Sequence, residues 1–357
     1  MPISLHSHSG QFCKHATGNL EDVIKTAIQK GFISYGLSEH MPRNRSMDLY
    51  PEERDMGVDE LSEQFERFII EANHLKSKYS SQINLLIGIE TEMIDEEVTT
   101  SLLDQVLKNH GDSIDYLVGS LHHVNQIPID FDKPTFHKAC QSLTPDSSMN
   151  PTEESLYKLC SNYFDAQYAL MVRFQPEVIG HFDLCLLYYP DLNLKKDKSI
   201  WDKVERNIKF GMSYGALFEV NSAALKKGWS TPYPSPDILK LISKFGGRLT
   251  LSDDSHGPHQ VGMNYARVLD YLTQHQVKEI WFLEQVNKNP SESLDKTIML
   301  PRQRVKASLL PDQWQDHSFW SKETLTVSDR FSNRDFTVLT DAVCPVIFVQ
   351  KDERKKF

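Results

Sequence analysis

The sequence predicts an α/β fold in which seven parallel strands form a barrel. Two observations predict it: short apolar, β-branched runs alternate with helical patterns, and each run turns polar where it ends. The alternation is typical of parallel strands joined by crossover helices, in an open doubly wound sheet or in a barrel. An open sheet gathers only the polar ends near its switch point, whereas a barrel brings all of them to one rim. The barrel therefore explains more of the pattern.

Each predicted strand is an apolar run with a polar end. The seven runs are ISLHSH at 3–8, ISYGLSEH at 33–40, NLLIGIETEM at 84–93, DYLVGSLHHV at 115–124, EVIGHFDL at 177–184, ALFEVNSA at 216–223 and RLTLSDDSH at 248–256. Their ends place histidine and acidic side chains at the C-terminal rim, where the loops of a barrel build its active site.

Helices are expected between these strands because apolar residues recur there with helical spacing. In the first helix they stand at i, i+3, i+4, i+7 and i+8 from Leu20, with Asn19 as its N-cap and Gly31 at its end. Similar spacing predicts helices around 58–79, 98–110, 153–173, 199–214, 235–245 and 260–275. The polar, proline-punctuated segment 126–152 is expected to be a loop over the rim, or a lid.

Composition narrows the class of partner. The chain has 357 residues, a formal net charge of −10 and dispersed Lys and Arg, which argues against nucleic acid and anionic membranes as partners and for a small molecule. Its five cysteines are odd in number and form no Cys-x-x-Cys pair, which favours a reducing compartment. No apolar run reaches the ~20 residues of a membrane span, and no secretory signal is recognisable, so we expect a cytoplasmic protein. The oligomeric state is not predicted.

The polar strand ends favour a metal centre. His6 and His8 point the same way in an extended strand and can present two nitrogens to one ion. Alone, the pair is compatible with chance in a chain of 14 histidines. Repetition of Asp, Glu and His at the other strand ends favours a metal, because half-buried polar groups need partners. Imidazole and carboxylate without thiolate suit zinc, manganese or iron.

Taken together, these motifs resemble the PHP (polymerase and histidinol phosphatase) superfamily, and more narrowly its fungal-type histidinol-phosphatases. The motifs in order are HSHSGQFCKHATG, SEHMPR, GIETE, GSLHHVNQIPIDFD, GHFDL, EVNSAALKKGW and LSDDSHGPHQVG. The resemblance covers about residues 3–320 and implies one PHP-type domain at 1–320. Residues 321–357 form a C-terminal extension of unknown role, in which FTVLTDAVCPVIFV predicts one or two strands.

The resemblance implies a distorted seven-stranded (β/α)7 barrel with three divalent metal ions, zinc, manganese or iron, at its C-terminal rim. Nine ligands carry over: His6, His8, His15, His40, Glu90, His122, His181, Asp254 and His256. Glu90 is the expected bridge between two ions. By strand alternation, His123 and Asp253 are expected to support the ligands from the opposite face, and His259 to be an exposed loop residue.

The implied activity is hydrolysis of L-histidinol phosphate to L-histidinol and phosphate in histidine biosynthesis, by attack of a metal-bridging hydroxide. The chain has no Cys-x5-Arg loop, which agrees with direct attack without a phosphoenzyme. Glu90, Asp254 and His256 are the catalytic candidates, the last two as proton donors to the leaving group. The alternatives are another PHP hydrolase, a phosphodiesterase or nucleotide phosphatase, and a non-catalytic PHP scaffold.

Substrate contacts are expected around the metals. Arg43 and Lys226 are candidates for phosphate, with Asn221 and Ser222 as hydrogen-bonding groups. Glu92 either supports a ligand histidine or receives the substrate's cation, for which Asp130, Phe131 and Asp132 are also candidates. One departure from related fungal enzymes is Leu186 and Leu187, where those often carry a basic residue; Arg173 is a candidate substitute.

Overall fold

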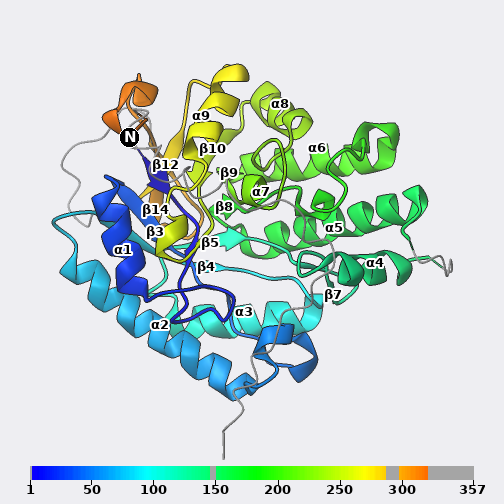
Figure 1. The fold of residues 1–357 in the computed structure, drawn as a ribbon, viewed down its shortest axis with the longest axis horizontal. Helices are drawn as coiled ribbons and strands as arrows, with labels where there is room; N and C mark the ends of the chain where they lie inside the picture. Colours follow the sequence, from blue (N-terminus) through cyan, green and yellow to red (C-terminus); the bar gives the residue numbers. More distant parts are fainter. Residues whose placement is uncertain (1, 145–149, 287–296, 321–357) are drawn as a thin grey trace, which may run out of the picture.

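Seven parallel strands surround a common interior in the computed structural model (Figure 1), which describes residues 2–144, 150–286 and 297–320. Their order is β1-β3-β4-β5-β8-β9-β10. The bounds are β1 Ile3–Ser4, β3 Ser34–Leu37, β4 Asn84–Glu90, β5 Tyr116–Gly119, β8 Val178–Ile179, β9 Leu217–Asn221 and β10 Arg248–Ser252. Each strand lies within its predicted run. The strands predicted at 321–357 lie outside the described residues.

The two edges of this sheet meet, so the sheet is nearly closed into a barrel. The backbone N–H of Leu5 donates to the carbonyl of Leu251 at 3.2 Å. Beyond this point β2 (Ser7–His8) pairs in parallel with β11 (Ser255–His256), which brings His8 opposite His256. The predicted seven-stranded barrel is confirmed. It is distorted at this seam, since Asp254, between β10 and β11, adopts a left-handed backbone with φ 47°.

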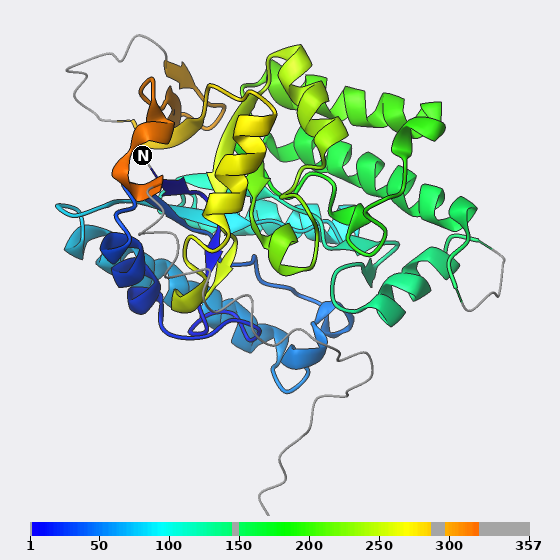
Figure 2. The same cartoon turned by 45° about the horizontal axis from the view of Figure 1, so that its top comes forward.

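Helices cover the outside of the barrel on all the sides visible in Figures 1 and 2. Their bounds are α1 Leu20–Gln29, α2 Val58–Lys78, α3 Glu96–His110, α4 Lys133–Gln141, α5 Glu153–Phe174, α6 Lys198–Ser213, α7 Ala223–Lys226, α8 Pro236–Phe245 and α9 Tyr265–Gln274. Within the described residues, none is long and apolar enough to cross a membrane. The seven predicted helices are all present, because each carries the apolar face that packs on the strands.

The ends of α1 differ in one detail from the prediction. Gly31 ends the helix as expected, with φ 79° and its N–H donating to the carbonyl of Ile28 at 2.9 Å. Asn19 occupies the N-cap position, but its side chain makes no capping hydrogen bond. The side chain of Gln11 accepts from the N–H of Leu20 at 3.1 Å instead, so the preceding loop performs the capping.

Segment 126–152 is not simply a loop, and that prediction was wrong in part. After a short hairpin of β6 (His123–Val124) and β7 (Ile127–Pro128), α4 begins at Lys133. Asp132 caps it, accepting from the N–H of Thr135 at 2.7 Å. The prolines that suggested a loop include Pro134, which lies in the first turn of α4, where proline is compatible with a helix. Whether the segment acts as a lid stays a prediction.

A three-stranded antiparallel sheet, not foreseen from the sequence, follows the barrel. It contains β12 (Trp281–Gln285), β14 (Val305–Leu309) and β13 (Thr297–Met299), in that order. The buried residues of this sheet and of the barrel interior form one apolar cluster: Leu5, Leu86, Tyr116, Val118, Val178, Leu217, Trp281, Leu283, Leu300, Val305 and Ala307. Most of the barrel residues in it lie near the strand starts. The small sheet therefore closes this end and leaves the C-terminal rim open.

Candidate metal centre

The carboxylate of Glu90, at the end of β4, lies at the centre of the rim. Five imidazole nitrogens approach it from four other segments of the chain, since His6 and His8 share one. They are Nε2 of His6 at 3.1 Å, His8 at 3.4 Å, His122 at 3.2 Å and His181 at 3.0 Å, and Nδ1 of His40 at 2.8 Å. Ligands of a tetrahedral ion with bonds of about 2.0–2.1 Å lie about 3.3 Å apart, so these separations match a metal cluster.

Asp254 faces the same centre from the opposite wall. Its Oδ1 lies 3.7 Å from His6 Nε2 and 3.6 Å from His8 Nε2. The left-handed backbone at Asp254 turns this side chain inward while Asp253 turns outward. Asp253 accepts from Ser4, Tyr35 and the N–H of Gly262, and thus fixes the seam of the barrel.

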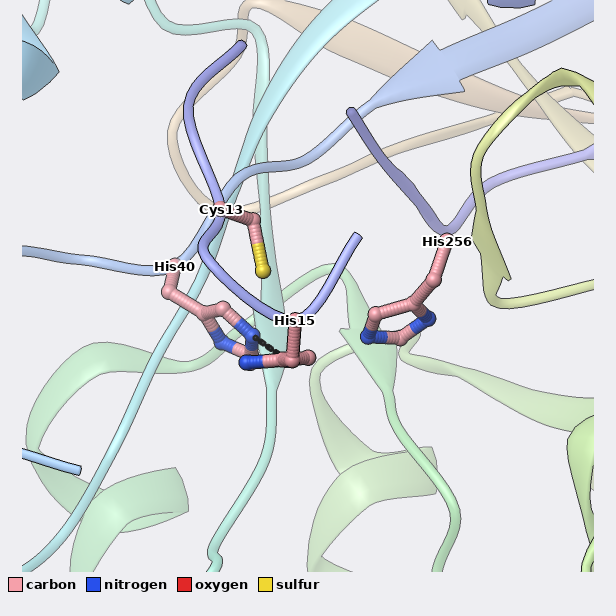
Figure 3. Close-up of side chains that lie close together, drawn as sticks. All are labelled: Cys13, His15, His40 and His256. Carbon is pink, nitrogen blue, oxygen red and sulfur yellow. Dashed lines mark hydrogen bonds between the residues drawn. The ribbon is translucent and has the colours of Figure 1, made fainter. Parts of the chain in front are cut away.

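A third group of donors lies beside these two, where the 9–17 loop, β3 and β11 meet (Figure 3). Nε2 of His15 and Nε2 of His40 are 3.3 Å apart, and the ring of His256 lies 4.9 Å from that of His15. Cys13 belongs to the same group. All nine predicted ligands therefore lie around one centre, and their individual roles stay predictions.

Carboxylates behind the histidines orient several of the rings. Nδ1 of His6 donates to Glu219 Oε2 at 2.9 Å, and Nδ1 of His122 donates to Glu92 Oε2 at 2.9 Å. With Nδ1 occupied in this way, Nε2 carries the lone pair that faces the centre. Glu39 Oε2 lies 3.4 Å from Nδ1 of His8 in a similar position.

The charges of the centre keep its carboxylate ionised and two of its imidazoles neutral. Burial opposes ionisation of Glu90, but the surrounding imidazoles of His6, His122 and His40 hold its pKa well below the usual range. Burial, together with the charge on His8, holds the pKa of His40 and of His256 well below that of a free imidazole. An ionised carboxylate and a neutral imidazole are the forms in which these side chains bind metal ions.

Buried polar atoms without partners show that the donors fit metal ions. Nε2 of His6 and both ring nitrogens of His8 are buried and make no hydrogen bond. Such groups are rare in folded proteins because leaving them unpaired is costly. Among the residues that the structure describes, five groups of three or four donors have their ligand atoms within 4.8 Å of one another. Imidazole and carboxylate groups in this arrangement suit divalent transition ions.

A cavity of about 390 Å³ opens over the centre, within the range of small-molecule sites. His15, His40, Glu90, His122, His181, Asp254 and His256 form its floor, and the walls contain Tyr50, Glu52, Asp130, Phe131, Ala223, Lys226 and Lys227. Among the described residues that line it, Lys226 and Lys227 are the lysine and arginine side chains. The cavity thus combines a cation-binding floor with a wall that carries both basic and acidic groups.

Residues 4–223 match the family model of the PHP domain, which is more than half of the chain. The chain belongs to the PHP family. The match includes seven of the nine predicted ligands, from His6 to His181, and the carboxylate of Glu219, while Asp254 and His256 lie beyond it.

Proteins similar to this PHP chain are histidinol-phosphatases by name. The probable histidinol-phosphatase of Schizosaccharomyces pombe is 48% identical over 287 residues, which cover 80% of this chain and 90% of that protein. The histidinol-phosphatase of Saccharomyces cerevisiae is 31% identical over 352 residues, covering 89% and 99%. The family predicted from the motifs is therefore confirmed.

Two solved structures share the fold. The putative histidinol phosphatase of Listeria monocytogenes superposes with a TM-score of 0.60 at 21% identity, over 74% of this chain and 99% of that one. The Lactococcus lactis enzyme, complexed with zinc, L-histidinol and phosphate, has a TM-score of 0.50 at 18% identity, over 72% and 86%. At these identities the structural similarity supports the barrel fold, but it does not support a substrate or the role of any residue.

The residues predicted to contact the substrate fall into two groups: those at the cavity and those away from it. Lys226 lines the cavity, and its Nζ donates to Gln260 Oε1 at 2.9 Å. Asn221 lies next to the floor, where its side chain donates to Asp254 Oδ2 at 3.2 Å. Asp130 and Phe131 line the wall.

The remaining candidates have other partners and do not line the cavity. Arg43 is buried, forms an ion pair with Glu53 and lies over the ring of Tyr50. Ser222 is buried with its hydroxyl directed at the carbonyl of Asp253, at 3.5 Å, and Asp132 caps α4. Glu92 Oε2 accepts from Nδ1 of His122 and lies 3.0 Å from Nδ1 of His123. Glu92 therefore contacts the histidines from behind and supports their orientation.

Related fungal enzymes often carry a basic residue where this chain has Leu186 and Leu187. Among the described residues, no basic side chain of this segment lines the cavity in its place. Both leucines are buried in the core. Arg173 pairs with Asp104 at the surface and does not line the cavity. Lys227, which the sequence analysis did not single out, does line it, 3.8 Å from Asp130.

Sequence reasoning also missed Glu39, Glu219, Tyr50 and Glu52. Glu39 and Glu219 stand in the polar strand ends SEH and EVN, so their position was visible but their partners were not. Glu52 Oε1 lies 3.0 Å from His15 Nδ1, and Tyr50 stacks on His123 and packs edge-to-face against His15. These two residues lie in a loop whose sequence carries no signal of a site.

Proposed function

We infer that this chain hydrolyses L-histidinol phosphate to L-histidinol and phosphate, with three divalent ions held by the nine donors. One observation carries the inference: metal-binding side chains that are spread from residue 6 to residue 256 meet around Glu90 on the floor of a cavity with lysines in its wall. The sequence identity to named histidinol-phosphatases supports the choice of substrate. When bound, such ions neutralise phosphoryl oxygens and lower the pKa of a water molecule.

The residues of the chain give the phosphate its orientation. Lys226 and Lys227 face the floor from α7 and the residue after it, and can bind the phosphoryl oxygens that do not meet the floor. Asn221 holds Asp254 through its amide. Asp254 and His256 remain the candidates for the proton that the leaving alkoxide needs, since both reach the cavity.

The mouth of the cavity suits the organic part of this substrate. Histidinol carries an ammonium and an imidazole, and Asp130, Glu52, Phe131 and Tyr50 offer two carboxylates and two aromatic rings there. We assign the cation to Asp130 and Glu52, because these two carboxylates line the cavity, whereas Glu92 and Asp132 do not.

The compartment is part of the same proposal. The four described cysteines, Cys13, Cys140, Cys160 and Cys185, are free. Free, buried thiols suit the reducing cytoplasm in which amino-acid biosynthesis proceeds.

The test is phosphate release by the metal-loaded protein from L-histidinol phosphate and from bis(p-nitrophenyl) phosphate, with Glu90→Ala as the matched inactive variant. We expect release from the monoester only, and loss of both release and metal content in the variant. Preference for the diester would favour another PHP hydrolase. A metal-filled protein that releases nothing from either ester would favour a non-catalytic scaffold.

A further inference from the structure

Cys13 lies beside the three histidines of the third donor group. The 9–17 loop holds it there: the N–H of Cys13 donates to the carbonyl of Ser9 at 2.9 Å, and Gly10 N–H donates to Thr17 at 3.2 Å. Thr17 N–H in turn donates to the carbonyl of His256 at 3.1 Å, which ties the loop to β11. These backbone contacts therefore fix Cys13 next to His15, His40 and His256.

The sulfur is directed at the histidines and not at the core. Sγ of Cys13 and one nitrogen each of His15, His40 and His256 lie within 4.8 Å of one another. Figure 3 shows the sulfur pointing toward the pair formed by His15 and His40. Three imidazoles and one thiolate make a four-ligand set typical of zinc, with a Zn–S bond of about 2.3 Å.

A second buried group points to a cation at the same place. Oε2 of Glu39 is buried and makes no hydrogen bond, while Oε1 accepts from both the N–H and the hydroxyl of Ser9. A ligand oxygen of Glu39, Sγ of Cys13 and a nitrogen of His8 lie within 4.8 Å of one another, and both nitrogens of His8 also lack hydrogen bonds. Oε2 of Glu39 and Nδ1 of His8 face each other at 3.4 Å without forming a hydrogen bond, so a buried carboxylate oxygen next to the thiol lacks a full partner, which a cation would supply.

We propose that Cys13 is a thiolate ligand of the ion held by His15, His40 and His256. On binding, the bond between Sγ and the metal forms and the thiol proton passes to solvent, with no change of oxidation state. The inference rests on the metal centre of the proposed function and deepens it. A sulfur ligand makes this position softer than the two around Glu90 and Asp254, so it selects zinc or cobalt over manganese.

X-ray absorption on the zinc-loaded full chain tests the proposal directly. We expect a sulfur shell at about 2.3 Å, with about one sulfur per three zinc ions if all positions are filled. Cobalt-loaded protein is expected to show a thiolate-to-cobalt charge-transfer band. Cys13→Ser removes the sulfur shell and the band, whereas Cys160→Ser, a matched change at another buried thiol, retains both.

The outcomes separate this proposal from the proposed function. The wild-type sulfur shell is measured without any variant, so a misfolded Cys13→Ser protein does not block the test. Phosphate release from L-histidinol phosphate is measured on the same sample. Release without a sulfur shell overturns the role of Cys13 and leaves the function intact, whereas a sulfur shell that survives in Cys13→Ser overturns the proposal by assigning the sulfur to another residue.

Discussion

The ring of His6 is fixed by a carboxylate on the side that faces away from the centre. Glu219 Oε2 accepts from His6 Nδ1 at 2.9 Å, and its Oε1 accepts from the N–H of His181 at 3.1 Å. Glu219 thereby joins two predicted ligands from different strands. Glu219, His6 and His181 are all buried, and the low polarity around them strengthens these hydrogen bonds.

Glu219→Gln is expected to weaken metal retention. An amide in place of the carboxylate removes the negative charge that raises the basicity of His6, and such changes behind a ligand cost about 10–100-fold in metal affinity. Metal content after dialysis against a graded chelator measures the effect. Glu63→Gln, at an exposed site on α2, is the control and should match the wild type. Equal retention by both variants would contradict a positioning role for Glu219.

Lys226 gives the site a pH dependence. Its burial lowers its pKa from that of a free lysine, so it loses its proton at a lower pH than an exposed lysine does. The protonated form binds phosphate, and binding weakens as the pH rises through this lowered pKa. KM for L-histidinol phosphate should therefore rise on the alkaline side while kcat changes less.

The matched variants for this prediction are Lys226→Arg and Lys226→Met. Arginine keeps its charge and should flatten the alkaline rise in KM. Methionine should raise KM about tenfold or more at neutral pH, because a charge-assisted hydrogen bond contributes about 1.5–3 kcal/mol. KM profiles measured at saturating metal check both variants. An unchanged alkaline rise in Lys226→Met would assign the titration to another group.

At the scale of the element, the strands could be predicted because the information for each is local. A run such as NLLIGIETE shows an apolar body and a polar end within nine residues, and strand alternation alone gives Glu90 and Glu92 one face. α4 was missed since Pro134 was interpreted as a loop signal. The partners of Glu39 and Glu219 were not predictable either, because each lies on a different strand from the histidine it contacts.

The side chain of Tyr116 lies across the neighbouring strands β4 and β3, where two glycines leave room for it. A Cβ at Gly88 would lie 2.5 Å from Tyr116 Cζ, and one at Gly36 would lie 2.0 Å from its hydroxyl. The hydroxyl donates to the carbonyl of Leu5 at 2.7 Å, so the ring cannot move without breaking that bond. Tyr116 thus fills the barrel interior across three neighbouring strands.

Gly88→Ala is expected to destabilise the protein by about 1–3 kcal/mol through overpacking against this ring. The matched test is a double-mutant cycle with Tyr116→Leu, in which the smaller side chain leaves room for the new methyl group. Gly88→Ala should cost much less in the Tyr116→Leu background. Urea unfolding of the four proteins measures the cycle, and strictly additive effects would show that the two residues do not compete for space.

At the scale of the whole molecule, the three-stranded sheet and the barrel are joined by polar contacts as well as by apolar packing. Arg302, between β13 and β14, donates through Nε to Glu177 Oε1 at 2.8 Å and through a second nitrogen to Oε2. Glu177 also accepts from the N–H of Leu117 in β5 at 2.9 Å. No local pattern predicted this arrangement, because the two partners are 125 residues apart.

Arg302→Ala should therefore destabilise the whole chain by about 3 kcal/mol. Glu177 is completely buried, and removing one partner of a buried ion pair leaves an uncompensated charge, which costs about 3–5 kcal/mol. Arg304→Ala is the matched control: its ion-pair partner Asp112 is exposed, and such surface pairs contribute about 0–1 kcal/mol. The midpoint of urea unfolding measures both.

Activity gives a second readout for the same pair of variants. The Arg302 contact lies at the closed end of the barrel and the metal centre at the open rim, so folded Arg302→Ala protein should keep the kcat and metal content of the wild type. The loss of stability would then appear only as an unfolding midpoint at a lower urea concentration. If the two arginine variants unfold at the same urea concentration, the three-stranded sheet is not held to the barrel by this pair, and apolar packing around Trp281 and Leu283 must suffice.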